Sequence, residues 1–396
     1  MRFLRTRSSV FRMLAGAAAA AALACGAWEG CSIYDSSLLI EAGTDGGGDV
    51  VTPPPPDAGD GCNHARWPAR PVADDDASVQ DMEFYNALTF LDFGVSDGGT
   101  AKGVALGFDL DGICTCPGPD SCSPFTDAGT QCDQDGGIDN SAGSLIQEFS
   151  GASNFFDQAY IDKQIAAGVF GAIFRVRNYN GQANDTKVEL SIYVSNGTEG
   201  AQYGVPTPPK NDGTDRWTID PNSLLGGTLL PDAGPVPREA YDLNAYVSNY
   251  YLVGNLSNMP LAIGAANGEG LVSMDLAGAV VVAKLEPSGS SFRATGVVAG
   301  RWESKKLLTS LQMLRDPFDY DASLCGADPV YGLLKTKICG LQDIATNVLD
   351  DGKGAPCSAL SIAFGFQAEP ATYGSVFGPD ASVGGCGPQW TDQCGP

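Results

Sequence analysis

The sequence is almost without histidine, because His64 is the single one among 396 residues. Serine and cysteine hydrolases and multi-histidine zinc enzymes need imidazole groups at the reacting centre. His64 follows a proline-rich stretch and lies outside the segments expected to form the core, so these enzyme classes are excluded. Chemistry that uses only carboxylates, such as glycoside hydrolysis, survives this test. No pair of acids stands out, however, and the sequence therefore identifies no catalytic residue.

Basic residues are also scarce. The chain has 23 lysines and arginines against 47 acids, and its net charge is −24. Such a surface repels phosphate backbones, which excludes nucleic acid as a partner. Most of the acids are aspartates, and many adjoin glycine in expected loops, where aspartate favours turns and holds hard cations. The charge therefore suits cations, or neutral ligands such as sugars.

No apolar run near the start is long enough to cross a membrane. Four arginines precede an apolar run from Met13 to Ala24, which as a helix would measure about 18 Å against the ~30 Å hydrocarbon core. The run ends at Ala22-Leu23-Ala24-Cys25, which is typical of a lipoprotein cleavage site. We therefore expect residues 1–24 to be a signal peptide, and the exported protein to be anchored to the outer membrane by a lipid on Cys25.

Cys31 is the alternative lipid attachment site. Cleavage before Cys31 would follow Trp28-Glu29-Gly30, so the charged Glu29 would lie next to the cleavage position. A charge there is unfavourable in a lipoprotein signal, and Cys25 is therefore preferred. Removal of residues 1–24 takes away four arginines and no acid, so it lowers the net charge from −24 to −28.

Two regions follow the predicted signal peptide. Residues 25–81 are rich in Gly, Pro and Asp and contain four consecutive prolines at 53–56, which predicts a flexible tether with a stiff middle. Residues 82–396 are expected to form one domain, with a Cys- and Asp-rich insert at 109–140 that lacks strand periodicity.

The pattern of the domain predicts a mainly β fold. Apolar Val188, Leu190 and Ile192 alternate with Glu189 and Ser191, as in a strand with one buried face. We expect strands at 82–94, 102–110, 169–179, 187–195, 215–219, 240–247, 249–256, 259–264, 270–285, 291–302 and 360–369. A helix is expected over 141–168, and another with Ser304 as its cap. Many antiparallel strands with a few inserted helices predict a β-sandwich or jelly roll.

The insert carries the most specific motif, Asp109-Leu110-Asp111-Gly112, with a second acidic segment near its end. Calcium prefers several carboxylate oxygens around a sharp glycine turn. The second segment resembles part of an EF-hand loop, but Gln131 and Ala142 stand where two acidic ligands belong, so a self-sufficient EF-hand is excluded. The candidate ligands of a shared calcium site are Asp109, Asp111, Asp133, Asp135 and Asp139. The alternative is a disulfide-pinned loop whose acids cap turns and the following helix.

Twelve cysteines in an exported chain predict disulfides. If Cys25 carries the lipid, Cys31 is the natural unpaired residue. Cys114 and Cys116 are too close to bond to each other, and pairing cannot be deduced from sequence. Cys386 and Cys394 are candidates for closing a small loop, and zinc is an alternative for the first four cysteines of the insert. The cysteines expected in disulfides are Cys114, Cys116, Cys122, Cys132, Cys325, Cys339, Cys357, Cys386 and Cys394.

The wider pattern resembles a group of uncharacterised secreted bacterial lipoproteins. The matching stretches are 30–34 (Gly-Cys-Ser-Ile-Tyr), 107–112 (Gly-Phe-Asp-Leu-Asp-Gly) with Cys114, 136–140 (Gly-Gly-Ile-Asp-Asn) and the turn around 179–181 (Tyr-Asn-Gly). The resemblance implies only where the protein is located and how its regions are arranged along the chain. It also favours Cys31 as the lipid attachment site.

These observations predict a lipid-anchored envelope protein that carries a disulfide-stabilised binding or structural module. Its partners would be the membrane, through the lipid, and a glycan or an envelope protein. The aromatic residues that are candidates for stacking on sugars are Tyr179, Trp217, Tyr250, Tyr251 and Trp302. The alternative is a carboxylate-dependent glycan hydrolase, which two acids converging in a cleft would favour.

Overall fold

The computed structural model describes residues 62–75, 80–94, 106–116, 119–124, 131–149, 158–200, 207–265, 270–314, 323–378, 386–387 and 390–395, all within one unit. The strands are β1 (Met82–Asp92), β2 (Gly171–Tyr179), β3 (Asp185–Ser195), β4 (Arg216–Ile219), β5 (Tyr241–Ser248), β6 (Tyr251–Ala265), β7 (Gly270–Ser288), β8 (Ser291–Glu303), β9 (Ala359–Pro370) and β10 (Thr372–Val376). The α-helices are α1 (Ser141–Phe149), α2 (Gln158–Ala166), α3 (Ser304–Ser310) and α4 (Pro329–Gly340).

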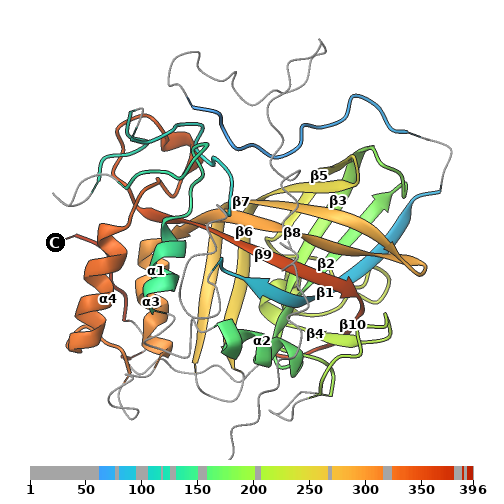
Figure 1. Ribbon diagram of the computed structural model, residues 1–396. Helices are drawn as coiled ribbons and strands as arrows, with labels where there is room; N and C mark the ends of the chain where they lie inside the picture. The colour runs from blue at the N-terminus through green and yellow to red at the C-terminus, as the bar shows by residue number, and fades with distance from the viewer. Residues whose placement is uncertain are drawn as a thin grey trace, which may run out of the picture. The chain divides into compact units, whose positions relative to one another are not determined.

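Eight of the strands in the described part of the chain close an antiparallel barrel (Figure 1). Their order is β1-β2-β3-β5-β6-β7-β8-β9, and the barrel closes where β9 pairs with β1, from Asp92 opposite Gly365 to Asn86 opposite Pro370. The remaining strands, β4 and β10, form a separate parallel pair. The mainly β, antiparallel expectation is confirmed, but the sheet closes on itself instead of forming the expected sandwich or jelly roll.

Side chains fill the barrel, as expected for eight strands. Aromatic rings form its centre: Phe174 stacks on Phe366 with ring centroids 5.0 Å apart, and Phe84 lies 5.5 Å from Phe292. Tyr179 contacts both Phe84 and Phe292 and is fully buried. The alternating residues of β3 point into this interior, as their pattern predicts.

Much of the outer face of the barrel is covered as well. On β1, β2 and β3, the β4–β10 pair packs its Trp217 and Ile219 against Ile173 and Tyr193. On β5 to β9, the loop that carries Phe108 covers a row of valines, and Trp67 packs edge-on against Phe108 with ring centroids 5.8 Å apart. Residues 62–75, which the sequence places in the tether, therefore lie against the barrel, above β5 in Figure 1.

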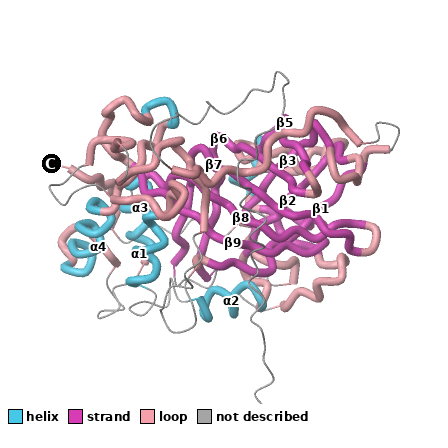
Figure 2. The backbone as a smooth tube through the Cα atoms, turned by 45° about the horizontal axis from the view of Figure 1, so that its top comes forward, coloured by secondary structure: helices cyan, strands magenta, loops and turns pink. Residues whose placement is uncertain are grey.

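The helices pack at the sides and one end of the barrel. Helix α2 contacts β1 and β6, which are not neighbours in the sheet, and its Ile161 and Ile165 join the interior core. Helices α1, α3 and α4 gather on one side, as Figure 2 shows, where α1 contacts β9 and α3 contacts β7 and β8. Among the residues that the structure describes, no helix is long and apolar enough to cross a membrane.

Several predicted elements differ from the observed ones. The expected helix over 141–168 is two helices, α1 and α2, with residues 150–157 outside the described part. Residues 106–110 form no strand, and 95–105 also lie outside the described residues. The two strands expected within 249–264 are one strand, β6. Ser304 begins α3 and donates to Ser358 O at 2.9 Å, so Glu303, not Ser304, occupies the N-cap.

Five disulfides join the cysteines of the described residues, and four of them pair residues more than 50 positions apart. The pairs are Cys62–Cys114, Cys116–Cys132, Cys122–Cys357, Cys325–Cys386 and Cys339–Cys394. The suggested bond between Cys386 and Cys394 is wrong, because each bonds to a residue beside or within α4. Five disulfides are typical of an oxidising compartment outside the cytoplasm.

Candidate functional site

The described loops within 106–140 and 341–358, here called the cap, bring three predicted acids together. Asp109, Asp111 and Asp139 each offer a carboxylate oxygen, and these oxygens lie within 4.8 Å of one another. Asp109 and Asp139 are buried, and Asp111 is half-buried. These three residues are called the acid cluster below.

Backbone N–H groups orient each member of the acid cluster. Gly112 N donates to Asp109 Oδ1 at 2.7 Å, Ile113 N to Asp111 Oδ1 at 2.8 Å, and Leu110 N to Asp139 Oδ2 at 2.6 Å. Each of these hydrogen bonds uses one oxygen of a carboxylate. Such bonds are expected if the acids cap turns of the insert, which was the alternative to a calcium site. The second oxygen of Asp111, Oδ2, is buried and has no hydrogen-bond partner of ordinary geometry. Asp109 Oδ2 has a partner as well, His64, so the carboxylates cap turns while their oxygens lie within 4.8 Å of one another.

The electrostatics of the acid cluster are unfavourable without a cation. Burial, together with the charge of Asp111, raises the pKa of Asp139 well above its usual value. Burial and the nearby Asp109 raise the pKa of Asp111 to about 6, although hydrogen bonds and Arg301 act in the opposite direction. Burial and the charge of Asp111 likewise raise the pKa of Asp133 to about 7. Gathering negative charge in a partly dry site is costly unless an opposite charge offsets it.

The backbone explains why these acids meet. Asp109 N donates to Ala65 O at 2.9 Å, and Asp139 N donates to Phe108 O at 3.1 Å, so three chain segments are joined at the acid cluster. Gly137 lies between them with a φ of +67°, and a Cβ there would approach Cys114 Sγ to 2.6 Å. Glycine therefore permits both the left-handed conformation and the close approach.

Arg301, which the sequence analysis missed, joins the cap to the barrel. It extends from β8, is fully buried, and donates to both carboxylate oxygens of Asp351 at 2.7 and 2.6 Å. The same guanidinium donates to Leu110 O at 3.0 Å and to Ala345 O at 2.7 Å. Arg301 thus supplies a positive charge that acts on Asp111, and it holds the loop that contains Asp109 and Asp111.

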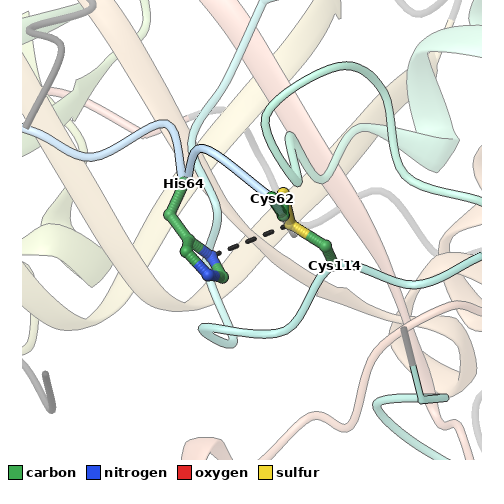
Figure 3. Close-up of side chains that lie close together, drawn as sticks. All are labelled: Cys62, His64 and Cys114. Carbon is green, nitrogen blue, oxygen red and sulfur yellow. Dashed lines mark hydrogen bonds between the residues drawn. A yellow bond between two sulfur atoms is a disulfide. The ribbon is translucent and has the colours of Figure 1, made fainter. Parts of the chain in front are cut away.

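A second group of potential ligands has different chemistry. Cys62, His64 and Cys114 also lie close together, and Figure 3 shows the imidazole of His64 beside the sulfur atoms, 3.8 Å from Cys114 Sγ. The two cysteines form a disulfide, so neither offers a thiolate. The zinc alternative for the insert fails for the same reason, since Cys114, Cys116, Cys122 and Cys132 are all in disulfides.

His64 is buried in the structure and does not lie apart from the folded region as the sequence suggested. Its Nδ1 forms a hydrogen bond with Asp109 Oδ2, so it positions a member of the acid cluster.

The remaining predicted ligands lie outside the acid cluster. Asp133 is half-buried beside it and accepts a hydrogen bond from Thr115 N at 2.6 Å, whereas Asp135 is exposed. Cys25 and Cys31 lie outside the described residues. Of the five aromatics expected to stack on sugars, only Tyr250 is exposed, because Tyr179, Trp217, Tyr251 and Trp302 belong to cores.

An open groove on the outer face of the barrel is a further candidate site. It measures about 1050 Å³ and lies over the outer face of β1, β2, β3 and β5, beside the segment 225–238. Glu83 and Glu189 both lie in it, and Arg177 contacts both carboxylates, at 3.4 and 3.1 Å. Two acids therefore converge in a cleft, although both are in ion pairs.

The raised pKa values of the cap predict how stability depends on pH without metal ions. Asp111, Asp133 and Asp343 have folded-state pKa values of about 6, 7 and 6, all above 3.8. Between about pH 4 and pH 7 the folded protein therefore binds more protons than the unfolded chain, and stability falls as pH rises. Calorimetry in chelator should give a higher melting temperature at pH 5 than at pH 8. A profile that rises over this range would contradict the assigned electrostatics.

Comparisons of the chain with protein-family models, with curated proteins and with solved structures returned no match.

Proposed function

We propose that this chain is an exported binding module, anchored by a lipid on Cys25 or Cys31, with a calcium ion in its acid cluster. The observation that carries the calcium site is the convergence of three buried or half-buried carboxylates within 4.8 Å. The resemblance to secreted bacterial lipoproteins and the predicted signal peptide support the anchor. The five disulfides support an extracytoplasmic location.

The chemistry of the donors favours calcium among the common ions. The acid cluster offers oxygen ligands alone, which suits hard cations, whereas zinc and copper favour nitrogen and sulfur. Calcium also tolerates irregular coordination completed by water. Burial and mutual repulsion raise the pKa values of Asp111 and Asp139, and one divalent ion would offset both effects.

Hydrolysis of glycans is less well supported than binding. A glycosidase needs one protonated acid and one ionised carboxylate flanking the scissile bond. In the groove, the carboxylate of Glu83 already binds the guanidinium groups of Arg175 and Arg177, and that of Glu189 binds Arg177, so neither points freely at a leaving group. Neither is therefore suited to act as the general acid.

Calcium titration tests the proposal. Isothermal titration calorimetry of the metal-free protein with calcium chloride should show one ion bound per chain. Asp111→Asn should weaken the affinity at least tenfold, since it removes a charged ligand from the acid cluster. Asp135→Asn, an exposed acid of the same insert, should leave the affinity unchanged. No binding by the parent protein, or equal losses in the two variants, would refute the site.

A further inference from the structure

The groove concentrates exposed apolar side chains. Nine large apolar side chains are exposed among the described residues, and four of them line this one groove: Leu225, Leu230, Tyr241 and Leu243. Tyr85 and Tyr373 add two half-buried rings, whose centroids lie 5.2 Å apart. Apolar surface gathered in a hollow, with polar groups beneath it, is typical of a ligand site.

The polar floor of the groove is a fixed network. Glu83 accepts hydrogen bonds from Arg175 Nε at 3.0 Å and from the Tyr85 hydroxyl at 2.7 Å. Glu189 accepts from Arg177 Nη1 and Asn178 Nδ2, both at 3.1 Å. These bonds hold the charged side chains in place, so a ligand that binds to their remaining donors and acceptors meets a preorganised surface.

The local charge balances although the chain is strongly acidic. Three arginines and three acids line the groove: Arg175, Arg177, Arg238, Glu83, Glu189 and Asp232. A charged ligand would therefore gain no net attraction from the lining, and an anion would be repelled by the rest of the protein.

The strands beneath the groove offer no free edge. Strands β1, β2 and β3 each pair with a neighbour on both sides within the closed barrel. An extended peptide could not add a strand there, and its backbone groups would lack the partners on which that mode of binding depends.

We propose that this groove binds a neutral oligosaccharide. The tyrosine rings and leucines of the groove would pack against the C–H faces of the sugar rings. The arginines and glutamates of the floor would form hydrogen bonds with sugar hydroxyl groups while their ion pairs stay intact. At about 1050 Å³ the groove lies at the upper end of the usual size of small-molecule sites, about 300–1,000 Å³, so it has room for more than one sugar unit. The inference rests on the proposed function as a binding module and names its ligand class.

Titration with four neutral hexasaccharides (of the cello-, xylo-, malto- and chito- series) tests the inference. The full chain should bind at least one of them and should not bind an oligogalacturonate. Tyr241→Ala should weaken that binding at least tenfold, or about 1.4 kcal/mol. The matched control is Tyr250→Ala, since Tyr241 and Tyr250 are 41% and 43% exposed and Tyr250 lies outside the groove; it should leave the affinity unchanged.

Three results would overturn the inference: binding of none of the four, equal losses in the two tyrosine variants, or a photo-crosslinker at position 241 that captures protein and never sugar. Calcium titrations of the same samples separate the two proposals. Calcium binding without sugar binding would refute only the groove, and sugar binding without calcium binding would refute only the acid cluster.

Discussion

Asp139→Asn should stabilise the protein in chelator and destabilise it in calcium. Without metal, asparagine still accepts the hydrogen bond from Leu110 N but removes a buried charge next to Asp111. With calcium at 100 times its dissociation constant, the parent protein gains about 2.7 kcal/mol from binding. The variant loses a ligand and most of that gain, so its stability relative to the parent changes sign between the two conditions.

Chemical denaturation of both proteins, in chelator and in saturating calcium, measures this reversal. Asp135→Asn should follow the parent under both conditions because its side chain is exposed. If Asp139→Asn is destabilised equally with and without calcium, the carboxylate of Asp139 has only a structural role.

Arg301→Met should lower the free energy of unfolding by about 3–5 kcal/mol, because one partner of a buried ion pair is removed. Asp351 would lose both hydrogen bonds from the guanidinium, and the carbonyl oxygens of Leu110 and Ala345 would each lose a charged donor. Since Leu110 lies between two acids of the acid cluster, calcium affinity should fall as well.

Arg216→Met is the matched control for the loss of an ion pair. Arg216 also pairs with a carboxylate, Glu199, at 2.6 Å, but its side chain is 57% exposed. Exposed pairs contribute at most about 1 kcal/mol, so this variant should unfold nearly as the parent does and bind calcium normally. Equal effects of the two substitutions would show that Arg301 does not hold the cap.

Local patterns in the sequence predicted the strands well. A strand with one buried face has alternating apolar and polar residues, and this alternation can be recognised without knowing the partner strand. Closure of the barrel depends on β1 pairing with β9, from residue 92 opposite 365 to residue 86 opposite 370. No local sequence pattern predicts a contact between residues so far apart in the chain. A closed barrel and a sandwich have strands of the same kind, which is why the architecture was predicted wrongly.

The candidate metal site could be predicted in part for a similar reason. The Asp109-x-Asp111-Gly motif places two acids beside one turn, and Asp139 joins them through a backbone bond to Phe108. Arg301 lies in a strand and is buried only because the cap folds over it. The burial of His64 also depends on contacts with Asp109, 45 residues away. Such contacts have no signature in the neighbouring sequence.

The most direct test of the calcium site is a crystal structure of the protein grown with calcium and measured for anomalous scattering. One anomalous peak is expected in the cap, about 2.3–2.6 Å from carboxylate oxygens of Asp109, Asp111 and Asp139. A map with no peak among these three side chains, at saturating calcium, would contradict the proposed site.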